Sequence, residues 1–458
     1  MQAVDACMKR QGKSGASLPC IRDEVFLHVW APVMTEYVEW VLEEALKSGK
    51  KRLYFLARDG YMMYLLAGIL VKAGSLDLEI RYLKISRYAI RSAEYYFAGK
   101  EALDTLCAGG MDVSFEKVMK RANLDEEEAR FIAKLAGYEK NYQTGLDHRQ
   151  LCRLKKDLFP IDRLFACIRE HSRGCYETAI SYFRQEGLFQ DIPYALVDSG
   201  WIGTLQYSLQ RVLEHETGKK FRIQGYYFGI YERPEGTVPD QYREFYFGKR
   251  EIRKKIRFSN CLFETVFSAP EGMTLGYGIS GRTSEPVCEA LEKMGGNPNA
   301  EVMRHFAELL LEYGTNYTAA EDRKKLSCDT AENDRNALRK DSSDNKRKKR
   351  VRFVERLLKP MMGSPTRLEA EAFGELLFCD DVLEKQVQPA AARWEEKELR
   401  KRRFWSRILM KMNLKTGTLH ESAWAEGSIM RLGKQVRKNM RQERFYKSFM
   451  YLRKAIGK

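Results

Sequence analysis

One stretch, KRLYFLARDGYMMY at positions 51–64, constrains the fold of this chain most strongly. Its apolar run ends abruptly in Arg58-Asp59-Gly60, and a second apolar run of helical length follows over Tyr61–Val71. This pattern is typical of a buried parallel strand that turns directly into a helix. Ligands bind at the carboxyl ends of the strands in open α/β sheets. We therefore expect the Arg58-Asp59-Gly60 turn to lie at a functional site.

Four further segments extend the strand pattern. Glu79–Ile85 alternates in polarity and leads into Ser86-Arg87, which predicts a β-α-β unit with a right-handed crossover. The other expected strands are Pro193–Val197, Phe221–Tyr231 and an edge strand over Tyr242–Gly248. The sequence therefore predicts an α/β fold with a Rossmann-like, mostly parallel sheet.

Changes in composition divide the chain into five regions. We assign 1–87 and 191–314 to the two parts of the Rossmann-like domain, 88–190 to a helical insert or cap, 315–350 to a polar surface linker, and 351–458 to a basic, mostly helical C-terminal region. Helical patterns in the insert cover Phe115–Ala122, Glu126–Ala136, Arg149–Leu158 and Ile161–Gln185. Another covers Glu24–Lys47 and is interrupted by Pro32. The insert either excludes water and selects a substrate, or only packs on the sheet.

Cysteine usage and hydropathy predict the compartment. The chain has 458 residues and ten cysteines, none of them in a CxxC pair, so a disulfide framework or zinc site is not expected. The N-terminal residues lack the apolar core of a secretory signal. No run reaches the roughly 18–20 apolar residues of a membrane-spanning helix. We expect a cytoplasmic protein, with peripheral attachment to the inner membrane surface as an option.

Two turns have the same pattern: an apolar strand, then an acidic residue and glycine, and then a helix. They are Arg58-Asp59-Gly60 and the segment from Asp198 to Thr204. A helix N-terminus is a ready phosphate site, and arginine adds bidentate contacts. Asp59 and Asp198 can bind Mg²⁺ together with a phosphate, act as a base, or hold a sugar hydroxyl.

The candidate site follows from these turns. The candidate catalytic residues are Asp59, Asp198 and Glu264, with Asp59 and Asp198 also as candidate Mg²⁺ ligands. The candidate substrate-binding residues are Arg58, Gly60, Ser86, Arg87, Ser199, Gly200, Trp201, Gly203, Thr204 and Gln206. Glu264 and the loop Ser268–Tyr277 are candidates to close over the site.

Several of these candidate residues also have a simpler, structural interpretation. Asp198 can be the N-cap of the following helix, and Arg58 with Asp59 can be a structural ion pair or a cap. Trp201 can belong to the core or to a lid. The basic cluster within Gly248–Phe258 is expected to be a solvated face. The chain has no P-loop, no HExxH motif and no assignable Ser-His-Asp set.

Four blocks carry a family resemblance. FLARDGYMM, YLKISR, VDSGWIGTLQ and ETVFSAPEGMTLGY resemble a region of predicted HAD-superfamily hydrolases from bacterial surface-polysaccharide gene clusters, sometimes fused to glycosyltransferases. The resemblance spans about Arg52–Tyr277, and a second, shorter similar stretch covers Pro360–Asp381. It implies an enzyme of cell-surface polysaccharide assembly that acts on a phosphorylated sugar or a nucleotide sugar.

The chain departs from the HAD pattern at its first strand. HAD phosphatases carry DxDxT there, whereas this chain has Arg58-Asp59-Gly60-Tyr61-Met62. In longer relatives a separate N-terminal HAD domain holds that motif, and we expect this chain to correspond to the region after it. An aspartyl-phosphate mechanism is therefore not carried over.

A second resemblance is to phosphoribosyltransferases. These enzymes pair a pyrophosphate loop with a later acidic loop that ends in Thr-Gly and contacts the ribose phosphate. Arg58-Asp59-Gly60 followed by Asp198–Thr204 is similar in order and type. The usual acidic pair is missing, because Ser199 follows Asp198.

Positive charge is concentrated in the C-terminal region. Residues 391–458 hold 19 Lys and Arg against 6 Asp and Glu, so they carry +13 of the net +16, and aromatic residues are interleaved among them. Such a segment can lie on an anionic membrane, bind nucleic acid, or pack as a solvated helical tail. The resemblance favours the membrane over nucleic acid, because surface glycans are assembled on lipid-linked intermediates. A catalytically inactive scaffold for glycosyltransferases is the alternative to an enzyme.

Overall fold

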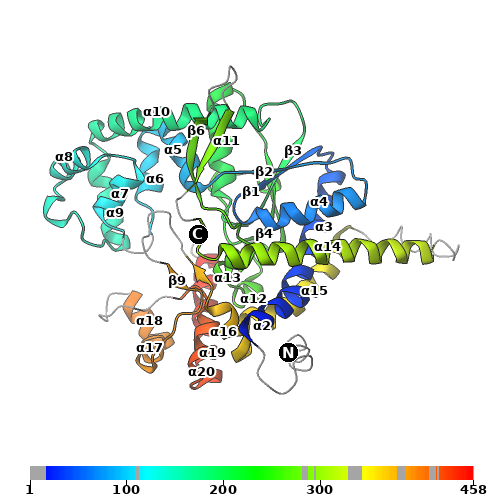
Figure 1. Ribbon diagram of the computed structural model, residues 1–458. Helices are drawn as coiled ribbons and strands as arrows, with labels where there is room; N and C mark the ends of the chain where they lie inside the picture. Colours follow the sequence, from blue (N-terminus) through cyan, green and yellow to red (C-terminus); the bar gives the residue numbers. More distant parts are fainter. Residues whose placement is uncertain are drawn as a thin grey trace.

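A five-stranded parallel sheet forms the centre of the protein (Figure 1). The structure is a computed structural model and describes residues 17–456 except 110–112, 281–286, 293–295, 329–342, 379–386, 412–418, 420 and 421. The strands are β1 (Arg52–Leu56), β2 (Glu79–Leu83), β3 (Tyr194–Trp201), β4 (Gln224–Ile230) and β5 (Tyr242–Phe247), in the spatial order β2-β1-β3-β4-β5. All four pairings are parallel. The predicted α/β fold with a Rossmann-like sheet is confirmed.

Alternating side chains of the strands feed two cores on opposite faces of the sheet. In β1, Leu53 and Phe55 enter one core, and Tyr54 and Leu56 enter the other. The helices α3 (Ala31–Lys47), α4 (Gly60–Ala73), α13 (Asn260–Phe267) and α14 (Ala300–Cys328) contribute to the first core. The helices α5 (Arg87–Ala98), α10 (Asp162–Gln185) and α11 (Thr204–Thr217) contribute to the second. The sheet is therefore covered by helices on both faces, as its apolar strands require.

The strand order reverses between β1 and β3. β2 lies on one side of β1, whereas β3, β4 and β5 follow one another on its other side. The carboxyl ends of β1 and β3 thus form a topological switch point, where ligands of doubly wound sheets bind. Arg58-Asp59-Gly60 follows β1, and the segment from Asp198 to Thr204 begins in the last half of β3 and continues past its end.

The N-terminal helical segment is divided as its proline predicted. α2 (Leu18–Val25) passes through a π-helical turn, η1 (Phe26–Trp30), into α3. Pro32 lies in the first turn of α3 and has no N–H to donate to a carbonyl of the preceding π-helical turn. The interruption is therefore a wide turn immediately before the proline.

The region between β2 and β3 contains helices with a core of their own (Figure 1). After α5 come η2 (Gly99–Glu101), α6 (Ala102–Leu106), α7 (Phe115–Arg121), α8 (Glu126–Ala136), η3 (Glu139–Asn141), α9 (His148–Leu158) and α10. The four helical runs predicted from the sequence agree with α7, α8, α9 and α10 to within one residue at each end. Capping boxes begin α8 at Asp125 and α9 at Asp147.

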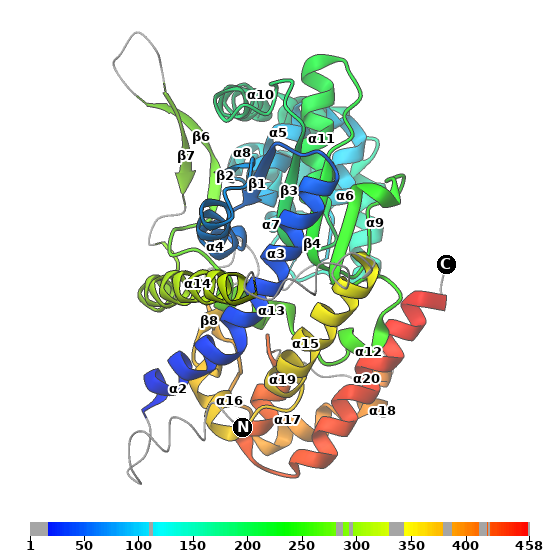
Figure 2. The same cartoon turned by 90° about the vertical axis from the view of Figure 1, so that its right-hand side faces the viewer.

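A β-hairpin follows α13 where the sequence predicted a loop. Between β4 and α13 lie η4 (Pro239–Gln241) and α12 (Ile252–Lys255). β6 (Thr274–Ser280) and β7 (Val287–Glu292) are antiparallel and pack beside α5 and α10. The interpretation of Ser268–Tyr277 as an irregular loop is therefore wrong from Thr274 onward. The hairpin projects at the upper left of Figure 2.

The interpretation of 315–350 as a linker is wrong at both of its ends. α14 continues through residue 328, and α15 (Ser343–Gly363) begins well before Val351. Residues 329–342 lie outside the described residues. The start of α15 packs against α3, because Arg350 forms ion pairs with glutamates on that helix.

The C-terminal helices pack on the body of the protein (Figure 2). They are α16 (Arg367–Gly374), α17 (Glu396–Lys401), α18 (Phe404–Lys411), α19 (Ala425–Leu432) and α20 (Val436–Ile456), with the short strands β8 (Leu377–Phe378) and β9 (Gln388–Pro389) between α16 and α17. Trp424 is fully buried in the first core, and its Nε1 donates to the Met362 carbonyl at 2.8 Å. None of the helices in the described ranges is both long and apolar enough to span a bilayer.

Candidate functional site

A cavity of about 610 Å³ opens at the switch point of the sheet. Its walls come from the turns after β1, β2 and β3, from the helical insert, from α13, and from α20. Of the predicted site residues it is lined by Arg58, Asp59, Ser86, Arg87, Asp198, Ser199, Gly200, Trp201, Gly203, Thr204 and Glu264. The fold therefore brings together residues that are spread over more than 200 positions of the sequence.

Asp59 and Asp198 form a pair of carboxyl groups in this cavity. Ser199 links them, since its hydroxyl donates to Asp59 Oδ2 while its backbone N–H donates to Asp198 Oδ1 at 2.9 Å. Burial raises the pKa of Asp59, against the opposing effects of the Ser199 hydrogen bond, Arg58 and Arg87. Burial, together with the nearby charge of Asp59, raises the pKa of Asp198. The pair therefore retains a proton at a higher pH than ordinary carboxyl groups do.

Neither Asp59 nor Asp198 has the capping or ion-pair role that was the simpler interpretation of its sequence position. Asp59 directly precedes α4, yet its side chain makes no capping hydrogen bond there. Asp198 lies within β3, and the N-cap of α11 is Gly203. Among the described residues, Arg58 forms no ion pair with Asp59. Both carboxyl groups are thus available to the cavity.

Two glycines shape the chain between Asp198 and α11. Gly200 has φ +110°, and a Cβ atom there would lie 2.4 Å from the Gly229 carbonyl oxygen. Gly203 has φ +72°, and its Cβ would lie 2.5 Å from the Tyr242 ring. Only glycine fits either position. This turn brings the N-terminus of α11, with Thr204, to the cavity wall.

Trp201 adopts a strained backbone conformation at the same turn. Its φ is +81°, which is rare for a residue with a side chain. The carbonyl of Trp201 accepts hydrogen bonds from the N–H groups of Tyr231 and Glu232, and its indole N–H donates to Glu264 Oε1. Strain of this kind concentrates at functional sites. The bond to Trp201 also fixes the carboxylate of Glu264 on the cavity wall.

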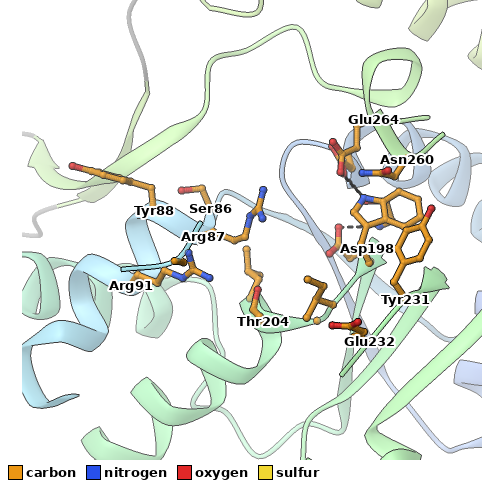
Figure 3. A pocket seen from close by; sticks show the side chains of 18 of the residues that line it. Ser86, Arg87, Tyr88, Arg91, Asp198, Thr204, Tyr231, Glu232, Asn260 and Glu264 are labelled. Carbon is orange, nitrogen blue, oxygen red and sulfur yellow. Dashed lines mark hydrogen bonds between the residues drawn. The ribbon is translucent and has the colours of Figure 1, made fainter. Parts of the chain in front are cut away.

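Arginines gather on the opposite side of the cavity (Figure 3). Arg87 and Arg91 lie one turn apart on α5, and Thr204 stands between them and the acidic side in this view. Burial lowers the pKa of Arg91, and the neighbouring Arg87 and Arg121 lower it further. Within the described ranges, the side chains of Arg87, Arg91 and Arg58 form no hydrogen bond and no ion pair. An anion would compensate this cluster of positive charge.

Arg121 is oriented by the backbone of the insert. Its Nη1 donates to the carbonyls of Leu106 and Ala108, at 3.1 and 2.7 Å. Arg121 lines the cavity together with Thr105 and Ala108. The insert is thus part of the cavity wall, and not only a layer packed on the sheet.

A third wall combines lysines with α20. Lys255 donates to the carbonyls of Tyr231 and Lys249, and burial lowers the pKa of its amine to about 8. Tyr451 stacks on Tyr231 with ring centroids 5.8 Å apart, and Lys454 pairs with Glu232 at 3.1 Å. Interpreting the basic cluster around Lys255 as a solvated face was wrong for this residue, because only 3% of it is exposed.

Two predicted binding residues have structural roles. Gln206 is buried outside the cavity, donates to the carbonyls of Ile223 and Gln241, and accepts from the Tyr227 hydroxyl. Gly60 begins α4 against β1, where a Cβ would lie 3.0 Å from the Phe55 carbonyl carbon. Neither lines the cavity, so the structure does not support a direct role in binding for either residue.

Ser86 lines the cavity, but its hydroxyl is occupied. The Ser86 Oγ donates to the Thr274 carbonyl at 2.6 Å and accepts from the Ala89 N–H as the N-cap of α5. Its contribution is therefore to hold the N-terminus of α5, and with it Arg87, at the cavity.

Several residues that line the cavity were not predicted from the sequence. They are Tyr88, Arg91, Arg121, Tyr231, Glu232, Lys249, Lys255, Asn260, Tyr451 and Lys454. Arg91 lies four residues after Arg87 on α5 and so shares its face, but no helix was predicted from the sequence over these residues. Nothing in the sequence connects Tyr451 or Lys454 to this cavity.

The donor set limits how a metal ion could bind. In the described part of the chain, no group of three or more His, Cys, Asp or Glu side chains is arranged to hold a metal ion. Asp59 and Asp198 supply two carboxyl groups, which suits Mg²⁺ only when phosphate oxygens and water complete its shell. These residues therefore fit a metal that arrives with a phosphorylated ligand.

Comparisons with known proteins give no family assignment. A scan against protein-family models finds no match, and a search of curated proteins finds no significant match.

Proposed function

We propose that this protein is an enzyme that acts on a phosphorylated sugar or a nucleotide sugar. The observation that carries the proposal is that unpaired arginines face a pair of proton-retaining carboxyl groups across one cavity. A phosphate group matches the arginines and the N-termini of α5 and α11. A sugar hydroxyl or a leaving oxygen matches the carboxyl pair. A volume of about 610 Å³ is within the range of small-molecule sites.

The carboxyl pair supplies acid–base chemistry. Because the pair holds one proton near neutral pH, its protonated member can donate to a leaving oxygen while the ionised member accepts a proton from an attacking hydroxyl. Arg87 and Arg91 would bind the phosphate, and Arg58 would stabilise negative charge that develops near Asp59. Mg²⁺, when bound through the phosphate, would neutralise phosphate charge. A role in cell-surface polysaccharide assembly rests on the resemblance of the four sequence blocks.

Ligand screening tests this proposal. Thermal shift is measured with glucose 1-phosphate, a UDP-sugar and phosphoribosyl pyrophosphate, each with and without Mg²⁺, and hits are assayed for turnover. We expect Arg91→Ala to weaken binding about 10-fold or more, because a charge-assisted contact is worth about 1.5–3 kcal/mol. Arg149→Ala, on the exposed start of α9, is the matched control. Asp198→Asn should retain binding and lose turnover.

The outcomes separate three functions. Turnover that is lost in Asp198→Asn supports the proposed enzyme. Protection by phosphoribosyl pyrophosphate alone supports the phosphoribosyltransferase-like alternative. Binding without turnover supports an inactive scaffold, and the absence of protection by any of the three ligands contradicts the site assignment.

A further inference from the structure

An exposed apolar surface lies on α18 and α20, which pack side by side (Figure 2). We call it the aromatic face. It is formed by residues with large exposed fractions: Trp405 72%, Phe445 58%, Leu452 48%, Leu409 39% and Phe449 38%. Phe404 is buried beneath it, with its ring centroid 5.1 Å from Trp405, 4.5 Å from Phe445 and 5.5 Å from Phe449. The three exposed rings thus share one buried support.

The spacing along α20 separates this face from the side that packs on the protein. Phe445, Phe449 and Leu452 follow one another at helical intervals of four and three residues, so they lie on one stripe. The opposite side holds Glu443, whose carboxylate pairs with Arg407 at 2.6 Å, and Lys447, which pairs with Glu426 at 2.7 Å. Folding therefore satisfies the polar side of α20 and leaves its apolar stripe in solvent.

The exposed charged side chains of α18 and α20 themselves are all basic. Five exposed basic residues of the two helices and of the turn before α18 belong to the side of the aromatic face: Arg403, Arg437, Lys438, Arg441 and Arg453. A sixth, Lys454, instead lines the cavity and pairs with Glu232. In α18 and α20 as the structure describes them, the one acidic residue is Glu443, and it is buried against Arg407. A partner for this surface must therefore accept apolar side chains and carry negative charge.

We propose that the aromatic face docks on the surface of an anionic lipid bilayer. Trp405, Phe445 and Phe449 would enter the headgroup region, and the surrounding cations would lie on lipid phosphates. Leu409 and Leu452 favour a bilayer over a nucleic acid, which offers stacking partners to rings but not to aliphatic side chains. A symmetric contact between two copies would place cations against cations. The docking is independent of the reaction proposed for the cavity.

Vesicle sedimentation with the full chain tests the proposal. The probes are phosphatidylcholine vesicles with and without 30% phosphatidylglycerol, at low and high salt. We expect binding to the anionic vesicles only, weakened by salt. Trp405→Ala/Phe445→Ala should weaken binding at least about 10-fold. Arg437→Glu/Lys438→Glu/Arg441→Glu should weaken it about 100-fold or more, since each surface cation contributes roughly 5-fold.

A matched control and a second readout guard against loss of folding. Phe131→Ala/Phe159→Ala removes rings that are 51% and 50% exposed on the insert and should bind vesicles like the wild type. Trp405 is the most exposed of the described tryptophans, so anionic vesicles should shift the emission of the wild type to the blue but not that of Trp405→Phe. No binding to either vesicle, binding of an RNA oligonucleotide without vesicle binding, or concentration-dependent self-association through this face would each overturn the proposal.

Discussion

At the scale of single residues, the cavity depends on groups that are kept in states they would not hold in water. Asp198 and Asp59 retain a proton because they are buried near one another, and Trp201 is held at a positive φ by hydrogen bonds to its carbonyl. Each state costs folding free energy that the surrounding structure must offset. Substituting such a residue should therefore change stability and function in opposite directions.

The pH dependence of stability follows from the carboxyl pair. Because the native pKa of Asp198 is raised, the native state binds this proton more tightly than the unfolded state does. Stability therefore falls as the pH rises from the ordinary carboxyl range through the raised pKa. Asp198→Asn removes this loss, so its melting temperature relative to the wild type should rise by about 1–3 °C between pH 5 and pH 8. Thermal unfolding across that range checks it, and a constant difference would contradict the burial of a shared proton.

At the scale of elements, the sequence predicts local structure well where one hydrophobic run ends sharply. β1 with α4, β3 with α11, and the helices of the insert follow from such runs and from their caps. The β6–β7 hairpin escaped prediction because its glycine-rich first strand, TLGYGIS, resembles a loop and is stabilised only by its partner strand and by α5 and α10. The helical ends of the polar 315–350 segment escaped because their stability comes partly from tertiary contacts, such as the ion pairs of Arg350.

The junction of α3 and α15 gives a prediction at this scale. Arg350 is 8% exposed and pairs with Glu36 at 3.1 Å, with Glu43 at 2.7 Å, and with Glu39. Arg350→Met would leave three carboxylates facing one another, and should cost about 3 kcal/mol at pH 8. The cost should shrink toward pH 5, because burial raises the pKa of Glu36 and protonation removes the repulsion.

Urea unfolding at both pH values measures this cost. Adding Glu39→Gln to Arg350→Met should restore part of the lost stability, since it removes one of the repelling charges. An equal loss at pH 5 and pH 8 would show that packing, and not charge, accounts for the effect of Arg350.

At the scale of the whole molecule, the C-terminal region belongs to the same core as the sheet. Trp424→Ala should lower the free energy of unfolding by about 3–5 kcal/mol, because Trp424 is fully buried and bonded to Met362. Trp405→Ala, at a residue that is 72% exposed, is the matched control and should change it by less than about 0.5 kcal/mol. Denaturant unfolding followed by circular dichroism measures both, and similar values would mean that the C-terminal region does not stabilise the body.

Long-range placement is where the sequence was least informative. The two turns were expected at one sheet edge, because parallel strands end together. The third wall was not foreseen, since Tyr231 and Tyr451 are separated by 220 positions and meet only through the packing of α20. The prediction for Lys255 was wrong for the same reason. A run of lysines and arginines predicts exposed side chains, whereas Lys255 is buried by the ring and the carbonyl of Tyr231, which are distant in the sequence.

The part played by α20 has a consequence for how the cavity comes into being. The turns after β1, β2 and β3 all precede residue 205, whereas Tyr451 and Lys454 complete the wall from the far end of the described chain. During synthesis the carboxyl pair and the arginines therefore leave the ribosome well before their last neighbours. A nascent or truncated chain that stops before α20 presents an arginine cluster and two acidic groups without their closing wall, so the cavity is complete only after α20 has been synthesised and has packed.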